Sequence, residues 1–372
     1  MRTHAEGQQT TASAPNAHAE GSQTTASGLN SHAEGGNTIA SAYAAHAEGD
    51  TTIASGWASH AEGTDTISSG NSTHAEGSRS RATGVFAHAE GYFTLASGSY
   101  SHAEGSTTTA SGNYAHAQGL ETVADGYYSH AEGTITSTNM LAGVHIMGKC
   151  GTANMLPNSW YLANGINPNF PGLAAAILTT GDVKIDGAVS SPAADYAEMF
   201  ETSDGSPIEP GYFIALAGKK VRIATAADPF IVGISSAKPA FLSGNAELSW
   251  PRKYLTDEWG RTLYHDVTVP ALHGQNGQVV VPEHIERQPQ LNPDWDPRQK
   301  YMPRLGRAEW VAVGMIGKLL VRDDGSCQPG ALCKPGDNGY ATAATAPGSG
   351  YYVLERTAQN RLLVLFGSRF YL

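Results

Sequence analysis

One tetrapeptide, His-Ala-Glu-Gly, recurs every 14 residues through the first third of the chain. A tenth copy has Gln118 in place of the glutamate, two residues after His116. Ten copies at one fixed period define a repeat architecture, in which each repeat is a structural unit stacked on the next. The nine complete copies begin at His4, His18, His32, His46, His60, His74, His88, His102 and His130.

Within each repeat, small and polar residues alternate until a glycine interrupts them. Alanine recurs one and eight residues after the histidine, and glycine recurs three and often ten residues after it. This alternation favours short strands followed by turns, and no apolar stripe has the spacing of a helix. We therefore predict that each repeat forms one coil of a parallel β-roll. With strands ~4.8 Å apart, ten coils give a rod roughly 48 Å long.

The same alternation assigns the side chains to faces. The small residues on either side of each histidine, and those six and eight positions after it, are predicted to point inward. The residue seven positions after the histidine varies and is predicted to face solvent, whereas the histidine and glutamate point outward on the other side. The constant face is expected to be a trimer-interface ladder that begins with His4, Glu6, His18, Glu20, His32, Glu34, His46, Glu48, His60 and Glu62.

A roll lined by alanine and threonine buries little apolar surface, which contributes roughly 25 cal/mol per Å². That contribution does not offset backbone ordering, which costs about 1–2 kcal/mol per residue. We therefore expect three rolls to pack around an axis, with the histidines and glutamates hydrogen-bonded between chains. Trimer stability should then depend on pH, and the direction stays open because burial and pairing shift a histidine pKa in opposite senses.

Histidine and glutamate are also metal ligands. A metal site needs three or four ligands gathered together, whereas these residues form uniform ladders. The sequence thus favours interchain hydrogen bonds over metal binding, and we expect neither a metal nor another cofactor.

The repeat resembles the head domain of YadA-type trimeric adhesins, which is a left-handed parallel β-roll trimer of 14-residue repeats with a Ser-x-Ala-x-Gly core. The stretches 31–35, 59–63 and 101–105 carry the likeness, which covers residues 1–137. The resemblance implies an all-β chain with a left-handed roll. This chain departs from that family by having histidine and glutamate where the adhesin head usually has valine and isoleucine.

Charge is distributed unevenly along the chain. The formal net charge is −11, and residues 1–137 carry 13 acidic against 3 basic residues. An acidic rod argues against binding to nucleic acid or anionic membranes. The sequence has no apolar run of 18 residues, so we expect no membrane insertion. The repeat starts four residues from Met1, so we expect no signal peptide. These features favour a virion protein assembled in the host cytoplasm over an exported surface adhesin.

The repeat is followed by an expected connector at residues 138–187 and a compact β-rich domain at residues 188–372. Residues 285–305 are polar and rich in proline, and we expect them to form a long loop. No long helix is expected. The predicted strands of the domain are 213–216, 221–223, 230–234, 310–316, 319–321, 351–354 and 362–366.

An acidic motif opens this domain, because Asp195 and Glu198 follow the tripeptide Ser190-Ser191-Pro192. Two carboxylates at one site repel each other, which raises one pKa and leaves a charged base beside a neutral acid. Such a pair activates a water molecule and protonates a leaving amine. A structural role is the alternative, because Asp-x-x-Glu is common at helix starts.

The stretches 194–201, 254–261 and 310–318 are similar to the autoproteolytic intramolecular-chaperone domain of phage pre-neck appendage tailspikes, a glutamic-type peptidase. The likeness covers about residues 188–372. It implies a domain that trimerises, helps a β-solenoid fold in register, and then cuts itself off. By position, Asp195 and Glu198 are the implied catalytic carboxylates, and the scissile bond is Ser190–Ser191 or Ser191–Pro192. A peptide bond with a proline such as Pro192 on the leaving side is a poor substrate for many hydrolases.

Two functions from different classes follow. The first is a trimeric phage tail appendage or spike that cleaves itself, with tail or baseplate proteins and a host-surface receptor or glycan as partners. The second is an uncleaved structural trimer or adhesin whose C-terminal domain is a permanent tip. A glycan-degrading enzyme is less favoured, because equivalent glutamates in every coil provide no unique catalytic pair.

Overall fold

The computed structural model describes residues 2–245, 248, 252–273, 277, 279–298, 300–345 and 350–367. The chain forms two compact units, one of Met1–Ala188 with Thr268–Ile285 and one of Val189–Val267 with Glu286–Leu372. The one helical element among the described residues is a single 3₁₀ turn, η1 (Arg304–Gly306). Strands account for nearly all regular structure, as the sequence predicts.

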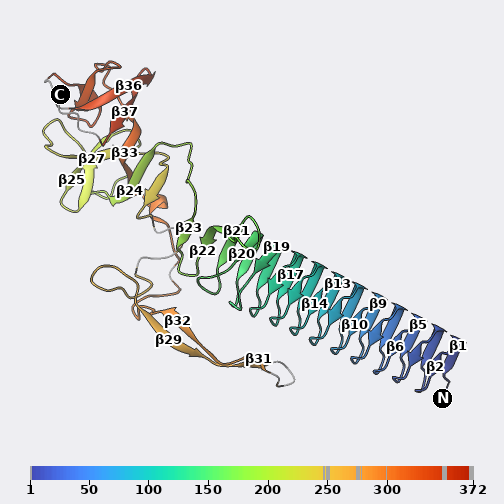
Figure 1. The fold of residues 1–372 in the computed structure, drawn as a ribbon. Coiled ribbons are helices and arrows are strands. Elements are labelled where there is room, and N and C mark those ends of the chain that lie inside the picture. The colour runs from blue at the N-terminus through green and yellow to red at the C-terminus, as the bar shows by residue number, and fades with distance from the viewer. Residues whose placement is uncertain are drawn as a thin grey trace. The chain divides into compact units, whose positions relative to one another are not determined.

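Residues 4–137 of the first unit form a parallel β-solenoid (Figure 1). Each coil contributes two strands except the last, which contributes the single longer strand β19. Each histidine pairs with the histidine 14 residues later, as in His32 with His46, so the coils stack in strict register. The predicted parallel β-roll is confirmed. The longer strands are β1 (His4–Gln8), β3 (His18–Ser22), β5 (His32–Gly36), β7 (His46–Asp50), β9 (His60–Thr64), β11 (His74–Ser78), β13 (His88–Tyr92), β15 (His102–Ser106), β17 (His116–Leu120) and β19 (His130–Ser137).

The shorter strands form the opposite side of each coil and also pair in parallel. They are β2 (Thr11–Ala12), β4 (Thr25–Ala26), β6 (Ile39–Ala40), β8 (Ile53–Ala54), β10 (Ile67–Ser68), β12 (Arg81–Ala82), β14 (Leu95–Ala96), β16 (Thr109–Ala110) and β18 (Val123–Ala124).

The interior of the roll consists of small side chains, as predicted. Ala33, Thr38 and Ala40 of one coil are completely buried, and their equivalents are buried in nearly every other coil. Glycine is required at the strand position that follows each glutamate. Gly35 has φ +102°, and a Cβ atom there would lie 2.1 Å from the carbonyl oxygen of Gly49 in the next coil. A larger residue at this position would break the stacking.

At the C-terminal end of the roll, larger buried side chains replace the small ones of the earlier coils. Strand β20 (His145–Thr152) continues the ladder, with Ile146 buried where earlier coils have alanine. Strand β21 (Trp160–Asn164) stacks on β20 in parallel, and β22 (Leu173–Ile177) and β23 (Val183–Ile185) then pair in antiparallel fashion.

The second unit contains a ten-stranded sheet in which β26-β25-β27-β33-β37-β36-β34-β35 lie in order, and β24 pairs with β33 and β28. Its core includes Phe213, Ile234, Val321, Val353 and Leu362. The predicted strands are found, although 310–316 and 319–321 belong to one continuous strand. The strands are β24 (Asp195–Glu201), β25 (Phe213–Ala217), β26 (Lys220–Ile223), β27 (Ile231–Ser235), β28 (Phe241–Ser243), β33 (Trp310–Arg322), β34 (Leu332–Pro335), β35 (Ala341–Ala343), β36 (Tyr351–Ala358) and β37 (Arg361–Phe366).

The loop predicted at residues 285–305 begins later than expected. Strand β32 (His284–Pro289) pairs with β29 (Tyr264–Val269), and β30 (Leu272–His273) pairs with β31 (Val279–Val281). No residue of β29 or β32 is buried, so these two strands lack the buried apolar face that marks a strand in sequence. No helix in the described part of the chain is long and apolar enough to cross a membrane.

Candidate functional site

The predicted cleavage segment lies outside regular structure, directly before strand β24. Ser190 and Pro192 are exposed and Ser191 is half-buried. The Ser191 hydroxyl oxygen accepts a hydrogen bond from the Ala193 amide at 3.2 Å. This segment is therefore accessible and only lightly constrained, as a peptide bond that is to be hydrolysed requires.

A cavity of about 830 Å³ lies next to this segment, and Pro192, Ala193, Ala194 and Asp195 contribute to its wall. All the residues that line it belong to the second unit. The charged residues around this cavity are not apparent from the sequence, because they share no local motif. They come from the segment between β27 and β28 and from strands β33, β36 and β37. These charged residues are Lys238, Lys318, Arg322, Glu355 and Arg361.

Asp195 is the acidic residue of the motif that faces this cavity. Its side chain is buried, with 6% of its surface exposed, and Oδ2 has no hydrogen-bond partner among the described residues. Its main-chain oxygen accepts a hydrogen bond from the Ala240 amide at 2.8 Å. The backbone is thus fixed while one carboxylate oxygen stays available for chemistry.

Gly317 on β33 holds the chain immediately before Asp195. The amide of the following residue, Lys318, donates a hydrogen bond to the Ala194 carbonyl oxygen at 3.3 Å. Gly317 has φ +121°, and a Cβ atom there would lie 2.1 Å from that same oxygen. Only glycine permits this close approach, which places the cleavage segment against β33.

Glu198 lies on the other face of β24. Along this strand, Asp195, Ala197 and Met199 are buried, whereas Glu198 is partly exposed and pairs with Ser243 across the β24–β28 ladder. Side chains three positions apart point to opposite sides of a strand. The expectation that Asp195 and Glu198 share one site is therefore not met within a single chain, and their catalytic roles stay predictions.

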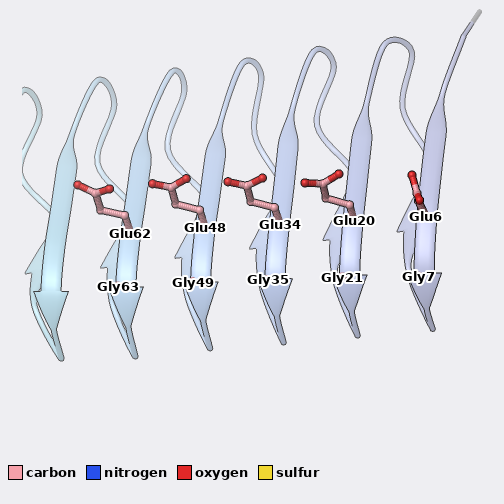
Figure 2. A pocket seen from close by; sticks show the side chains of 10 residues that line it. All are labelled: Glu6, Gly7, Glu20, Gly21, Glu34, Gly35, Glu48, Gly49, Glu62 and Gly63. Atoms are coloured by element: carbon pink, nitrogen blue, oxygen red, sulfur yellow. The ribbon is translucent and has the colours of Figure 1, made fainter.

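The His–Glu face forms a second candidate site along the roll. Figure 2 shows Glu6, Glu20, Glu34, Glu48 and Glu62 side by side, each followed by a glycine on the same strand. These glutamates and glycines line a groove of about 640 Å³. The imidazole rings stack beside them, for example His46 and His60, whose centroids are 4.7 Å apart. The structure thus places all ten predicted ladder residues on one continuous face.

Burial lowers the pKa of several ladder histidines. The pKa values of His32, His46, His88 and His116 lie below 6.5, first because burial disfavours the imidazolium and second because neighbouring histidines would repel its charge. The same two causes lower the pKa of His130 to about 4. The neighbouring glutamates oppose these shifts without reversing them.

Together, the fold and the site define a β-solenoid followed by a β-rich domain with an accessible segment beside a cavity. The family model for the Peptidase_G2, IMC autoproteolytic cleavage domain matches residues 166–360, more than half of the chain. The chain belongs to this family and carries its autoproteolytic cleavage domain.

Curated relatives include phage proteins that are much longer than this chain. The pre-neck appendage protein of Bacillus phage B103 is 32% identical over 161 residues, which cover 41% of this chain and 17% of that protein. The match to the pre-neck appendage protein of Bacillus phage phi29 has the same identity and coverage. A putative phage-related protein of Bacillus subtilis is 34% identical over 167 residues, which cover 44% of this chain and 19% of that protein. The chain therefore spans less than a fifth of these relatives.

A solved structure shares the fold along almost the whole chain. The crystal structure of the pre-mature bacteriophage phi29 gene product 12 has a TM-score of 0.53 and 21% identity. The match covers 98% of this chain and 39% of that chain. This likeness supports the arrangement of a solenoid followed by a β-rich domain.

Proposed function

We propose that this chain is a structural trimeric phage tail appendage that cleaves itself. In this proposal the C-terminal domain drives trimerisation and in-register folding of the roll, then cuts the chain near Ser190–Pro192. The family assignment and the phage appendage relatives support this role. The observation that carries it is the buried Asp195 carboxylate on a cavity that Pro192 also lines.

The cleavage is a hydrolysis of the Ser190–Ser191 or Ser191–Pro192 bond. Asp195 acts as the base that takes a proton from water, whose oxygen forms a bond to the carbonyl carbon. The C–N bond then breaks, and a protonated carboxyl group returns a proton to the leaving nitrogen. The glutamic-type assignment gives this second task to Glu198. Because Glu198 lies on the opposite face of β24, it needs a rearranged strand or a neighbouring subunit to reach the bond.

Trimerisation before folding of the roll has a physical rationale in the repeat itself. Each coil presents the same residues to the next, so a slip by one coil restores nearly every histidine and alanine pairing. Rolls that associate without guidance therefore have many misregistered states of similar energy. A terminal domain that trimerises first aligns the three chains and removes those states.

An exposed apolar row on the second unit supports a subunit interface. Phe241, Tyr196 and Ile316 lie side by side across β28, β24 and β33, and their exposed fractions are 50%, 41% and 62%. Water contact with such a row is unfavourable, and large exposed apolar patches mark interaction sites. We assign this row to contact with the other two copies of the chain.

The alternative is an uncleaved trimer or adhesin with a permanent C-terminal tip. A denaturing gel of the freshly purified 39.0 kDa chain separates the two proposals. Two fragments, each about half of that mass, support self-cleavage. A single full-length band that persists on incubation supports the alternative. Partners on the virion and a host receptor or glycan belong to both proposals and do not distinguish them.

A further inference from the structure

The His–Glu face brings potential metal ligands closer together than a uniform ladder suggests. Each glutamate of the column lies within 3.9 Å of the histidine of its own coil, of the histidine of the next coil, or of both. The Glu48 oxygens, for example, lie 3.8 Å from Nε2 of His46 and 3.8 Å from Nε2 of His60. Corresponding separations elsewhere range from 3.3 Å at Glu62 and His74 to 3.9 Å at Glu132 and His130. Every glutamate of the column thus has at least one imidazole beside it, and Glu48 and Glu132 each have two.

These separations are longer than ordinary N–H···O hydrogen bonds, which measure about 2.7–3.2 Å. They match the edge of a metal tetrahedron, because bonds of about 2.0–2.1 Å place neighbouring ligands roughly 3.4 Å apart. Triplets of donor atoms lie within 4.8 Å of one another, and one further group accompanies the five that follow. The five are His46-Glu48-His60, His88-Glu90-His102, His130-Glu132-His145, Glu20-His32-Glu34 and Glu62-His74-Glu76.

Eight histidine Nε2 atoms in this face are buried and have no hydrogen-bond partner among the described residues. They are covered by the chain itself. An unpaired buried polar group is destabilising. The atoms are Nε2 of His32, His46, His60, His74, His88, His102, His130 and His145.

We propose that the His–Glu face binds a row of divalent transition-metal ions of the Zn²⁺ class. Two imidazoles with one carboxylate, or one imidazole with two, supply the nitrogen and oxygen donors that such ions accept. Mg²⁺ and Ca²⁺ fit less well because they require more oxygen ligands. The groove beside the glutamates leaves a remaining coordination position open to water.

The ring spacing sets the stoichiometry. Stacked imidazoles such as His46 and His60 have centroids 4.7 Å apart, which is too wide for both nitrogens to reach one tetrahedral ion. Two rings must therefore tilt toward each other, and a ring that tilts one way is unavailable to the opposite neighbour. The five named triplets share no residue, so about one ion binds for every two coils.

The negative charge of the roll also favours the binding of divalent metal ions. Residues 1–137 carry 13 acidic and 3 basic side chains, and a column of nine glutamates repeats at the spacing of the coils. Closely spaced carboxylates repel one another when they are uncompensated. Divalent ions neutralise this column without adding any side chain, and they link consecutive coils of a roll whose own core is small.

The ninth position of the column provides a natural control. Gln118 replaces the glutamate, yet strand β17 keeps the parallel register of its neighbours. The Gln118 amide donates a hydrogen bond to Glu132 at 2.9 Å. Glutamine is therefore accommodated in the fold at this position, and Glu→Gln variants remove a ligand with little structural cost.

The test measures zinc retained by the full chain. Protein stripped with EDTA is equilibrated with ZnCl₂, freed of unbound metal by gel filtration, and analysed by elemental mass spectrometry. We expect about six zinc ions per chain, in line with the triplets. The double variant Glu48→Gln/Glu90→Gln should retain about four. Glu121→Gln removes an exposed carboxylate outside the column and should leave the count unchanged.

Two results would overturn the proposal. One is that the stripped protein retains no zinc after gel filtration. The other is a zinc count that Glu48→Gln/Glu90→Gln does not change while its circular dichroism matches the parent, since that indicates binding by scattered surface histidines. Co²⁺ supplies an independent readout, because tetrahedral coordination gives strong visible absorption that should fall by about a third in the double variant.

Discussion

Asp195 and Glu198 stand three residues apart on strand β24 and point to opposite faces of the sheet. Asp195 is buried at the cavity beside the cleavage segment, whereas Glu198 faces β28 and the turn at Gly244. The two carboxylates therefore do not act as a contiguous pair in one chain. This arrangement separates their predicted roles and makes them testable one at a time.

Asp195→Asn should abolish self-cleavage, because an amide cannot take a proton from the attacking water. The expected loss of rate is at least 100-fold, within the range typical of a general base. Glu198→Gln should have a comparable effect only if Glu198 protonates the leaving nitrogen. The rate of fragment appearance on a denaturing gel measures both. Full cleavage in Asp195→Asn would rule out the base assigned here.

Gly317→Ala should slow cleavage while leaving both carboxylates intact. The added Cβ atom would collide with the Ala194 carbonyl oxygen and displace the segment that carries the scissile bond. Gly325→Ala serves as the control, because Gly325 also has a positive φ but a Cβ atom there meets nothing within 4 Å. Fragment yield is compared between variants of matched thermal stability. Equal yields would show that β33 does not position the segment.

Ile316→Glu should weaken trimerisation of the second unit. The substitution places a charge in the exposed row that Ile316 forms with Tyr196 and Phe241, and burying an unpaired charge at an interface is costly. Ile316→Val keeps the apolar surface and is the matched control. Native mass spectrometry should show trimers for the parent and the control, and mostly lower species for the charged variant. Intact trimers in Ile316→Glu would remove this row from the interface.

Acid should destabilise the metal-free roll. The unfolded chain binds protons at its histidines below about pH 6.5, whereas the folded roll holds His130 at a pKa of about 4 and lowers the pKa of His32, His46 and His88. Protons therefore favour unfolding, and stability falls as the pH drops from 6.5 toward 4. Thermal melts in EDTA-containing buffer check this prediction. A melting temperature that stays flat from pH 7 to 4 would contradict it.

Gly35→Ala should destabilise the roll by at least about 1–3 kcal/mol, the usual cost of one strained backbone position. Its φ of +102° disfavours a side chain, and the Cβ atom would collide with the next coil. Gly36→Ala, one residue later, is the matched control because a Cβ atom there meets only a side-chain oxygen of Asp50. Chemical denaturation compares the two variants. Equal denaturation midpoints would show that the position of Gly35 on β5 tolerates a side chain.

The sequence predicts the roll well because its pairing is local. Each coil contacts the coil 14 residues away, so one period assigns the strands and the buried faces, as Ala33 and Ala40 show. The fold of the second unit is harder to predict from the sequence, because β24 pairs with β33 more than 100 residues later. The spacing of Asp195 and Glu198 predicts one shared site, whereas in the structure their side chains lie on opposite faces of β24. The sequence also does not show that histidine and glutamate donor atoms gather in threes, because that grouping appears only when the coils stack.

The most direct test of the account is the intact mass of the freshly purified chain under denaturing conditions, combined with N-terminal sequencing of any fragment. The account predicts two species, each about half of 39.0 kDa, with the second beginning at Ser191 or Pro192. A single species of 39.0 kDa that persists after prolonged incubation would contradict self-cleavage and leave the C-terminal domain as a permanent tip.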